Sequence, residues 1–288
     1  MRRELRIEVA NHIIGLNIEE TFQAPFIKNY AVFLSAGLPE ISLDVELSPD
    51  VPLLDGSEPR LEFHDKLITV ISEYLIGSLD LQTKSGKIKI NPAYFLHSLG
   101  TFLRNIFTLL AVLEDNGIVL HAVGIVRDEE VYIFIGPSGA GKTTVAKLSE
   151  GKVILSDDLV LMKKIDNEFM VFPTPDWGDK QIGPRENKPY RINSMFRLIK
   201  DKMVYLEEFS PAHALADIFT IPHMEPELIP KDALLARFFE LISAVPYYRL
   251  HFLPEPSFWD CIEEERMKNG VKRKNTGQVR QDCLKVNR

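Results

Sequence analysis

The chain has 288 residues, of which 45% are hydrophobic and 26% are charged, so it can bury a sizeable core without disulfides. Its net charge of −7 gives no general affinity for nucleic acid or anionic membranes, and Cys261 and Cys283 lack the spacing of a zinc site. No leader peptide or clean membrane-spanning segment is apparent. We therefore expect a cytoplasmic protein with no nucleic-acid or membrane partner.

Residues 1–91 carry the alternation of half-buried strands. Apolar residues occupy every second position from Ile41 to Leu47, and shorter segments at 5–9, 61–63 and 88–90 show the same alternation. Glycine and proline separate these segments, and a helix is predicted over 26–34. The pattern predicts a smaller β-rich domain over residues 1–91.

A helical pattern begins at Asn91-Pro92 and continues to Asn116-Gly117. Strands are then predicted at 118–126, 131–135 and 153–155, and a hairpin at 159–162 and 170–172. Helices are predicted at 142–148, 211–218 and 231–244, followed by a strand at 247–253 and a last helix after Ser257. This order predicts an α/β domain over 92–265. Residues 266–288 carry eight lysines and arginines against Asp282 alone, which predicts a basic flexible tail.

The strand at 131–135 runs into a glycine-rich segment that fits the pattern G-x-x-x-x-G-K-[ST]. Glycines permit positive φ angles and a close approach of the backbone, so that successive N–H groups can surround phosphate oxygens. The lysine of this pattern reaches the β- and γ-phosphates, and the hydroxyl that follows it binds Mg²⁺. The predicted nucleotide-binding residues are Gly136, Pro137, Ser138, Gly139, Ala140, Gly141, Lys142, Thr143 and Thr144.

Two acids, Asp157 and Asp158, follow the apolar stretch 153–155, and Asp158 lies sixteen residues after Lys142. Carboxylates at the carboxyl end of a strand lie on the ligand side of an α/β sheet, where one can hold Mg²⁺ and the other can take a proton from a hydroxyl. His121 interrupts an otherwise apolar strand, and adjacent strands would bring it to the same edge as the loop. We take His121 as a candidate site residue on this ground.

These three segments together resemble the HPr kinase/phosphorylase superfamily. The resemblance covers about 40 residues, through Leu120 to Gly124, Gly136 to Thr144 and Leu155 to Asp158. It implies a P-loop-containing central sheet of the type found in the C-terminal domain of these kinases. Related kinases assemble, so by analogy we expect a homo-oligomer. The β-rich domain over 1–91 is the expected place for recognition of the acceptor.

The resemblance further implies the role of each matching residue. Lys142 would stabilise the transferring phosphate, Thr143 and Asp157 would bind Mg²⁺, and Asp158 would accept the hydroxyl proton, with His121 supporting the centre. The expected activity is transfer of the γ-phosphate of ATP, or of GTP, to a hydroxyl, such as a serine of a small protein, peptide or metabolite. The alternative is a nucleotide-binding ATPase or regulatory protein without a phosphoryl acceptor.

The chain departs from the family after the two acids. A glycine-rich segment that follows them in true HPr kinases has no clear equivalent, and the segment 174–185 stands in its place. The resemblance therefore does not extend to HPr as the acceptor. Within and beyond this segment, Asp176 or Asp179 could add a metal contact, and Arg185 or Arg249 could clamp phosphate.

Overall fold

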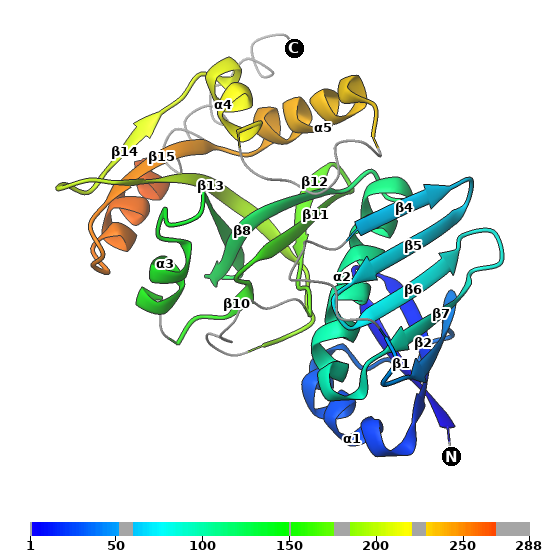
Figure 1. The fold of residues 1–288 in the computed structure, drawn as a ribbon. Helices are drawn as coiled ribbons and strands as arrows, with labels where there is room; N and C mark the ends of the chain where they lie inside the picture. Colours follow the sequence, from blue (N-terminus) through cyan, green and yellow to red (C-terminus); the bar gives the residue numbers. More distant parts are fainter. Residues whose placement is uncertain (1, 52–59, 150, 176–184, 221–228, 269–288) are drawn as a thin grey trace, which may run out of the picture.

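The computed structural model describes residues 2–51, 60–149, 151–175, 185–220 and 229–268. Over these ranges the chain forms two β-sheets that lie side by side, with one long helix between them (Figure 1). The fold is therefore mixed α/β, which confirms that part of the predicted fold class. The second strand-rich half begins directly after the helix.

The N-terminal sheet has, among the described residues, seven strands in the order β1-β2-β3-β7-β6-β5-β4. Pairing is antiparallel except between β2 and β3 and between β3 and β7. Alternate side chains of β3 are buried, as the period-two pattern predicts. The strands are β1 (Arg2–Val9), β2 (His12–Glu19), β3 (Ile41–Leu47), β4 (Arg60–His64), β5 (Leu67–Ser72), β6 (Leu75–Asp80) and β7 (Ser85–Ile90).

The second sheet has eight strands among the described residues, and β9 lies between β8 and β13. The pairs of β13 with β9 and with β15 are parallel, so the carboxyl ends of these three strands share one edge. The strands are β8 (Ile118–Arg127), β9 (Glu130–Ile135), β10 (Ile154–Ser156), β11 (Leu159–Ile165), β12 (Glu168–Phe172), β13 (Tyr190–Lys200), β14 (Tyr205–Glu208) and β15 (Tyr247–Phe252).

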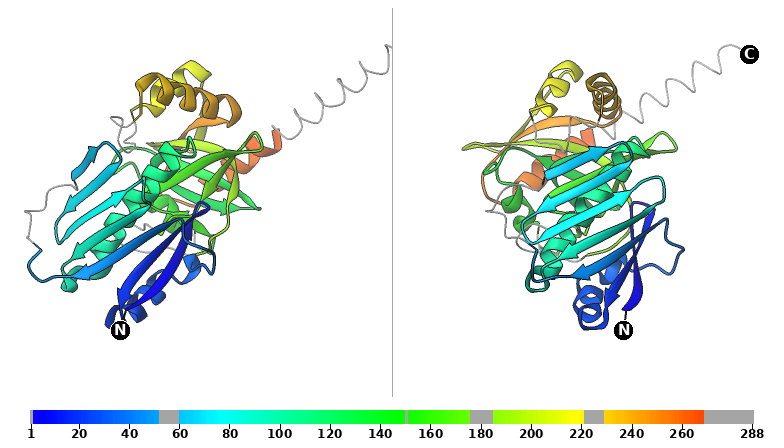
Figure 2. Two further views of the ribbon diagram at one scale, coloured as in Figure 1. Left: turned by 90° about the vertical axis from the view of Figure 1, so that its right-hand side faces the viewer. Right: turned by 45° about the vertical axis from the view of Figure 1, so that its right-hand side comes forward.

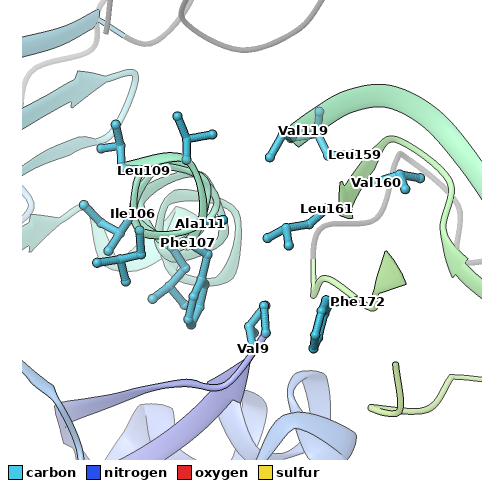
Figure 3. Packing of buried hydrophobic residues seen from close by; sticks show 14 of the residues in the cluster. Val9, Ile106, Phe107, Leu109, Ala111, Val119, Leu159, Val160, Leu161 and Phe172 are labelled. Atoms are coloured by element: carbon cyan, nitrogen blue, oxygen red, sulfur yellow. The ribbon is translucent and has the colours of Figure 1, made fainter. Parts of the chain in front are cut away.

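Helix α2 (Phe95–Leu113) packs against both sheets and carries the core that joins them. It follows the short 3₁₀ helix η2 (Pro92–Tyr94), where the Asn91 side chain accepts a hydrogen bond from the Ala93 N–H, as the predicted cap requires. Figure 3 shows Ile106 and Leu109 on the side of this helix away from Val119 of β8 and Leu161 of β11, so the helix presents apolar side chains in both directions. One continuous hydrophobic cluster thus spans the predicted boundary at 91/92.

By length and composition alone, the segment Pro92–Leu113 would be apolar enough to cross a membrane. In the fold, 67% of its most apolar window is buried inside the protein. A helix that is apolar on nearly all sides is expected when two sheets cover it. Its composition is thus explained by its place in the core.

Helix α1 (Glu20–Asn29) packs on β1, β2 and α2, and the other helices cover the second sheet (Figure 2). Helix α3 (Lys142–Leu148) packs on β8 and β9. Helices α4 (Pro211–Ile218) and α5 (Lys231–Ala244) pack on each other, and their bounds agree with the predicted ones. Residues 258–268 are helical, and their aromatic side chains join a second cluster with β9, β13 and β15.

Two predicted boundaries differ from the structure. The helix predicted over 26–34 is α1 (Glu20–Asn29) followed by the 3₁₀ helix η1 (Ala31–Phe33), so it begins earlier and ends near Tyr30. The prediction followed the apolar residues alone, but only Phe26 of α1 is buried. The last helix continues through 266–268, the first residues of the predicted tail. The rest of that tail, Cys283 included, lies outside the described residues.

Candidate functional site

The glycine-rich loop connects β9 to α3 in the center of the second sheet. Gly139 and Gly141 have φ angles of +77° and +114°, a region that side chains rarely occupy. A Cβ atom on Gly141 would lie 2.6 Å from the Phe252 ring, and one on Gly136 would lie 2.7 Å from the Ala140 Cβ. The loop therefore needs glycine at these three positions, two of them for space and two for backbone conformation.

Lys142 is the first residue of α3, and its side chain turns back into the loop. The residue is 8% exposed, and its ammonium donates to the carbonyl oxygens of Gly136 at 2.7 Å and Pro137 at 3.3 Å. Burial lowers the pKa of Lys142; the charge of Arg197 adds to this effect, and the charge of Asp158 opposes it. Thr143, the predicted metal ligand, is exposed beside it.

The acid pair lies in a tight turn between β10 and β11. The Ser156 hydroxyl accepts hydrogen bonds from the N–H groups of Asp158, at 3.3 Å, and Leu159, at 3.1 Å. The Asp158 carbonyl accepts from the Ala122 N–H at 2.9 Å. Hydrogen bonds to the turn and to β8 thus hold the backbone of Asp158, and this fixes the position of its Cα atom and the direction in which its side chain leaves the backbone.

His121 and Asp158 are in direct contact. Leu159 pairs with His121 across β8 and β11, and His121 Nδ1 lies 2.8 Å from Asp158 Oδ1. Arg104 from α2 brings Nη1 to 3.8 Å from the other carboxylate oxygen. Both the histidine and the aspartate are partly exposed.

This environment lowers the pKa of Asp158. The hydrogen bond from His121 is the largest cause, burial opposes it, and the charges of His121, Arg104 and Lys142 add to the lowering. Lys142 therefore acts electrostatically on Asp158, although Lys142 follows the glycine loop and Asp158 lies in the turn between β10 and β11. The carboxylate is ionised throughout the neutral range.

Asp157 lies close to a second basic side chain. Burial lowers the pKa of Arg185, and the charges of Tyr30 and Asp157 oppose that effect. Arg185 Nη1 also donates to the Asn29 carbonyl at 3.0 Å, at the end of α1. The N-terminal half thus contacts the basic neighbour of Asp157 through the Asn29 carbonyl, and α2 brings Arg104 to Asp158.

Two basic residues near the loop, Arg104 and Arg197, were not predicted. Arg104 is the only lysine, arginine or acid in α2, and one charge in a helix that is otherwise apolar is a signal that sequence alone offers. Arg249, considered as a phosphate clamp, is instead paired with Glu207 and Asp217. Asp176 and Asp179 lie outside the described residues.

A cavity of about 490 Å³ opens elsewhere on the second sheet, lined by Asn193, Tyr248 and Arg266 among others. His121, the glycine loop with Lys142 and Thr143, and the acid pair Asp157 and Asp158 do not line it. It adjoins the first half of β13, whereas the glycine loop adjoins the carboxyl end of that strand. The cavity is therefore separate from the candidate site.

No protein-family model matches the sequence, and no curated protein matches it. Among solved structures, the chain is similar to the HPr(Ser) kinase/phosphatase from Coxiella burnetii, with a TM-score of 0.37 and 15% sequence identity. The similarity covers 55% of this chain and 96% of that one. It amounts to a weak structural relationship, so any assignment of function rests on the residues around the loop.

Proposed function

We propose that the protein is a kinase that transfers the γ-phosphate of ATP to a hydroxyl group in a magnesium-dependent reaction. The observation that carries this proposal is the pairing of His121 with Asp158 at 2.8 Å at the sheet edge that carries the glycine loop, with the charge of Lys142 helping to lower the pKa of the same carboxylate. A phosphate-binding lysine beside an ionised, oriented acid is the pair of groups that phosphoryl transfer to a hydroxyl needs. Loop contacts are to phosphates, so GTP would be held by the same groups.

The residues around the loop fit a triphosphate and its metal. The loop has the glycine conformations that let backbone N–H groups approach phosphate, and the Lys142 ammonium is held there by carbonyl dipoles. Thr143 and Asp157 are the residues that would hold Mg²⁺. When bound, the cation would offset the charge of the β- and γ-phosphates.

In the proposed reaction, the acceptor oxygen forms a bond to the γ-phosphorus as the bond to the β–γ bridging oxygen breaks. The hydroxyl proton passes to Asp158, which is ionised because its pKa is lowered. His121 orients this carboxylate, and Lys142 stabilises charge on the transferring group. The negative charge that develops on the leaving diphosphate would thus lie next to the buried ammonium of Lys142.

We propose a serine hydroxyl as the acceptor, on a small protein, a peptide or a metabolite. The hydrogen bond from Arg185 to the Asn29 carbonyl supports a role for the N-terminal half in recognising it, because the charge of Asp157 acts on the same arginine. Arg104 adds a basic group from α2 beside Asp158. A macromolecular acceptor would be expected to contact more of that half than free serine would.

The test is phosphoryl transfer from γ-labelled ATP with Mg²⁺, using free serine or lysate from the source organism as acceptor. We expect label on an acceptor with the wild type, and loss of both nucleotide affinity and transfer with Lys142→Ala. Lys147→Ala is the matched control, because Lys147 lies on the same helix and is exposed. Phosphate release without a labelled acceptor would instead support the ATPase alternative, and the absence of both products would contradict the proposal.

A further inference from the structure

Arg197 lies on β13 beside the point where the glycine loop begins. In the parallel pair of β9 and β13, Arg197 is opposite Ile135, the last residue before Gly136. The next residue, Leu198, adjoins Gly136 from the other side, at 3.8 Å from the position of a Cβ there. The strand thus brings a guanidinium to the edge of the sheet that carries the loop.

This guanidinium is partly buried without a counterion. Its Nη1 atom is out of contact with solvent and has no hydrogen-bond partner, and no described residue forms an ion pair with it. Arg249, its register neighbour on β15, lies 3.7 Å from Glu207 and 3.6 Å from Asp217, with its guanidinium over the Phe209 ring. Arg197 and Arg249 are thus register neighbours with different surroundings. Arg249 has two acidic partners, and Arg197 has none among the described residues.

A second cation lies at the start of the same loop. The ammonium of Lys142 is bound by the carbonyl oxygens of Gly136 and Pro137 and not by a carboxylate, and Gly136 follows Ile135, the residue that pairs with Arg197. Two like charges at a partly buried edge cost free energy unless an anion lies with them, because desolvated charge requires a partner. Asp158 supplies one negative charge nearby, and it is shared with His121 and Arg104.

We propose that Arg197 is a phosphate-binding residue that contacts the terminal phosphoryl group of the nucleotide held by the loop. This inference rests on the proposed function and adds to it a residue that distinguishes a triphosphate from a diphosphate. A guanidinium donates two hydrogen bonds to a phosphate at once, which suits it to the terminal group with its three free oxygens. Arg197 lies beside the start of the loop, and a bound phosphate would supply the anionic partner that the described residues do not.

The experiment compares the affinities of Mg·AMPPNP, a non-hydrolysable triphosphate, and Mg·ADP for the full chain by calorimetry. We expect Arg197→Met to weaken Mg·AMPPNP binding about tenfold or more and Mg·ADP binding less than threefold. The same variant should raise the melting temperature of the nucleotide-free protein, because it removes an uncompensated charge. Arg191→Met is the control, since Arg191 lies on the same strand, exposed and paired with Glu168.

An arginine with a merely structural role would give the opposite pattern. A lower melting temperature for Arg197→Met, or unchanged affinity for both nucleotides, overturns the inference. If Lys142→Ala loses nucleotide affinity while Arg197→Met keeps it, the proposed function stands and the role of Arg197 falls. If the wild type binds neither nucleotide, both fall. Should the methionine variant not fold, Arg197→Lys must still weaken Mg·AMPPNP selectively.

Discussion

Two aspartates of this protein each contact a histidine and a basic side chain. Asp115 lies 2.6 Å from His12 Nε2 and pairs with Lys163, while Asp158 lies 2.8 Å from His121 Nδ1 and near Arg104. The two aspartates are equally exposed, at 27% and 26%, but their partners are not. The side chains of His12 and Lys163 are 9% and 7% exposed, against 33% and 28% for His121 and Arg104.

The surroundings explain what each group does. The Asp115 group joins the first hairpin, the end of α2 and β11, and Lys163 also donates to the Ala10 carbonyl, so its cation is fully used. The Asp158 group opens toward the loop lysine, and its members keep exposed atoms that can meet a ligand. The comparison teaches that pairing alone does not mark a candidate site. Partial exposure beside a buried lysine that binds carbonyl oxygens and not a carboxylate does.

The largest expected effect separates the two aspartates by activity. Asp158→Asn should lower kcat for acceptor phosphorylation at least about a thousandfold, because it removes the proton acceptor, while nucleotide affinity changes less than about threefold. The measurement is steady-state transfer together with Mg·AMPPNP calorimetry. Asp115→Asn should leave both within about twofold, since Asp115 lies in the other group. Near-normal transfer by Asp158→Asn would show that the proton acceptor is another group.

The second largest effect is on stability, and here the variant of Asp115 is the one that we expect to change. Asp115→Asn should lower the free energy of unfolding by about 1–3 kcal/mol at pH 7, since buried Lys163 and His12 lose a charged partner. Urea denaturation measures the change. Glu240→Gln is the matched control, because Glu240 pairs with the adjacent Lys164 at an exposed position. That control should cost less than about 0.5 kcal/mol.

The pH dependence of the difference in unfolding free energy between wild type and Asp115→Asn tests whether the ionised carboxylate causes it. Burial raises the pKa of Asp115, but hydrogen bonds from Lys163 and His12 and their charges outweigh it, so the pKa lies below its ordinary 3.8. A lowered pKa in the folded state stabilises above the unfolded value and loses that contribution as pH falls through the folded one. The stability difference between wild type and Asp115→Asn should thus be constant near neutrality and shrink below about pH 4. A difference that persists in acid would mean that the amide disturbs packing instead.

The parts of the fold that were predicted depend on local signals. The strand, glycine loop and helix from 131 to 148 follow from contiguous residue types, and the hairpin at Asp166-Asn167 follows from residues that accept positive φ, observed at +49° and +68°. Strand β13 was missed although it pairs with both β9 and β15. Its sequence mixes Arg191, Asn193 and Arg197 among apolar residues, so it resembles neither a half-buried nor a fully buried strand.

The residues of the site divide in the same way. Lys142, Asp158 and His121 could be named because each lies in a recognisable short pattern, and the register of β8 with β11 places the last two together. Arg104 and Arg197 come from a helix and a strand whose faces are decided by packing with distant segments. The lone charge of α2 singles out Arg104 in the sequence, but no local pattern specifies which residue of α2 meets β11, so its place beside Asp158 does not follow from the sequence.

The smallest expected effect concerns Arg104, which lies 3.8 Å from Asp158 at a partly exposed position. Arg104→Gln should lower kcat/KM about two- to fivefold, because it removes one of several groups that hold the carboxylate, and a partly exposed ion pair contributes little. If Arg104 acts only through Asp158, the double variant with Asp158→Asn should be no slower than Asp158→Asn alone. A further loss in the double variant would indicate that Arg104 contacts the acceptor itself, which would make the Asp158 group a binding surface as well as a catalytic one.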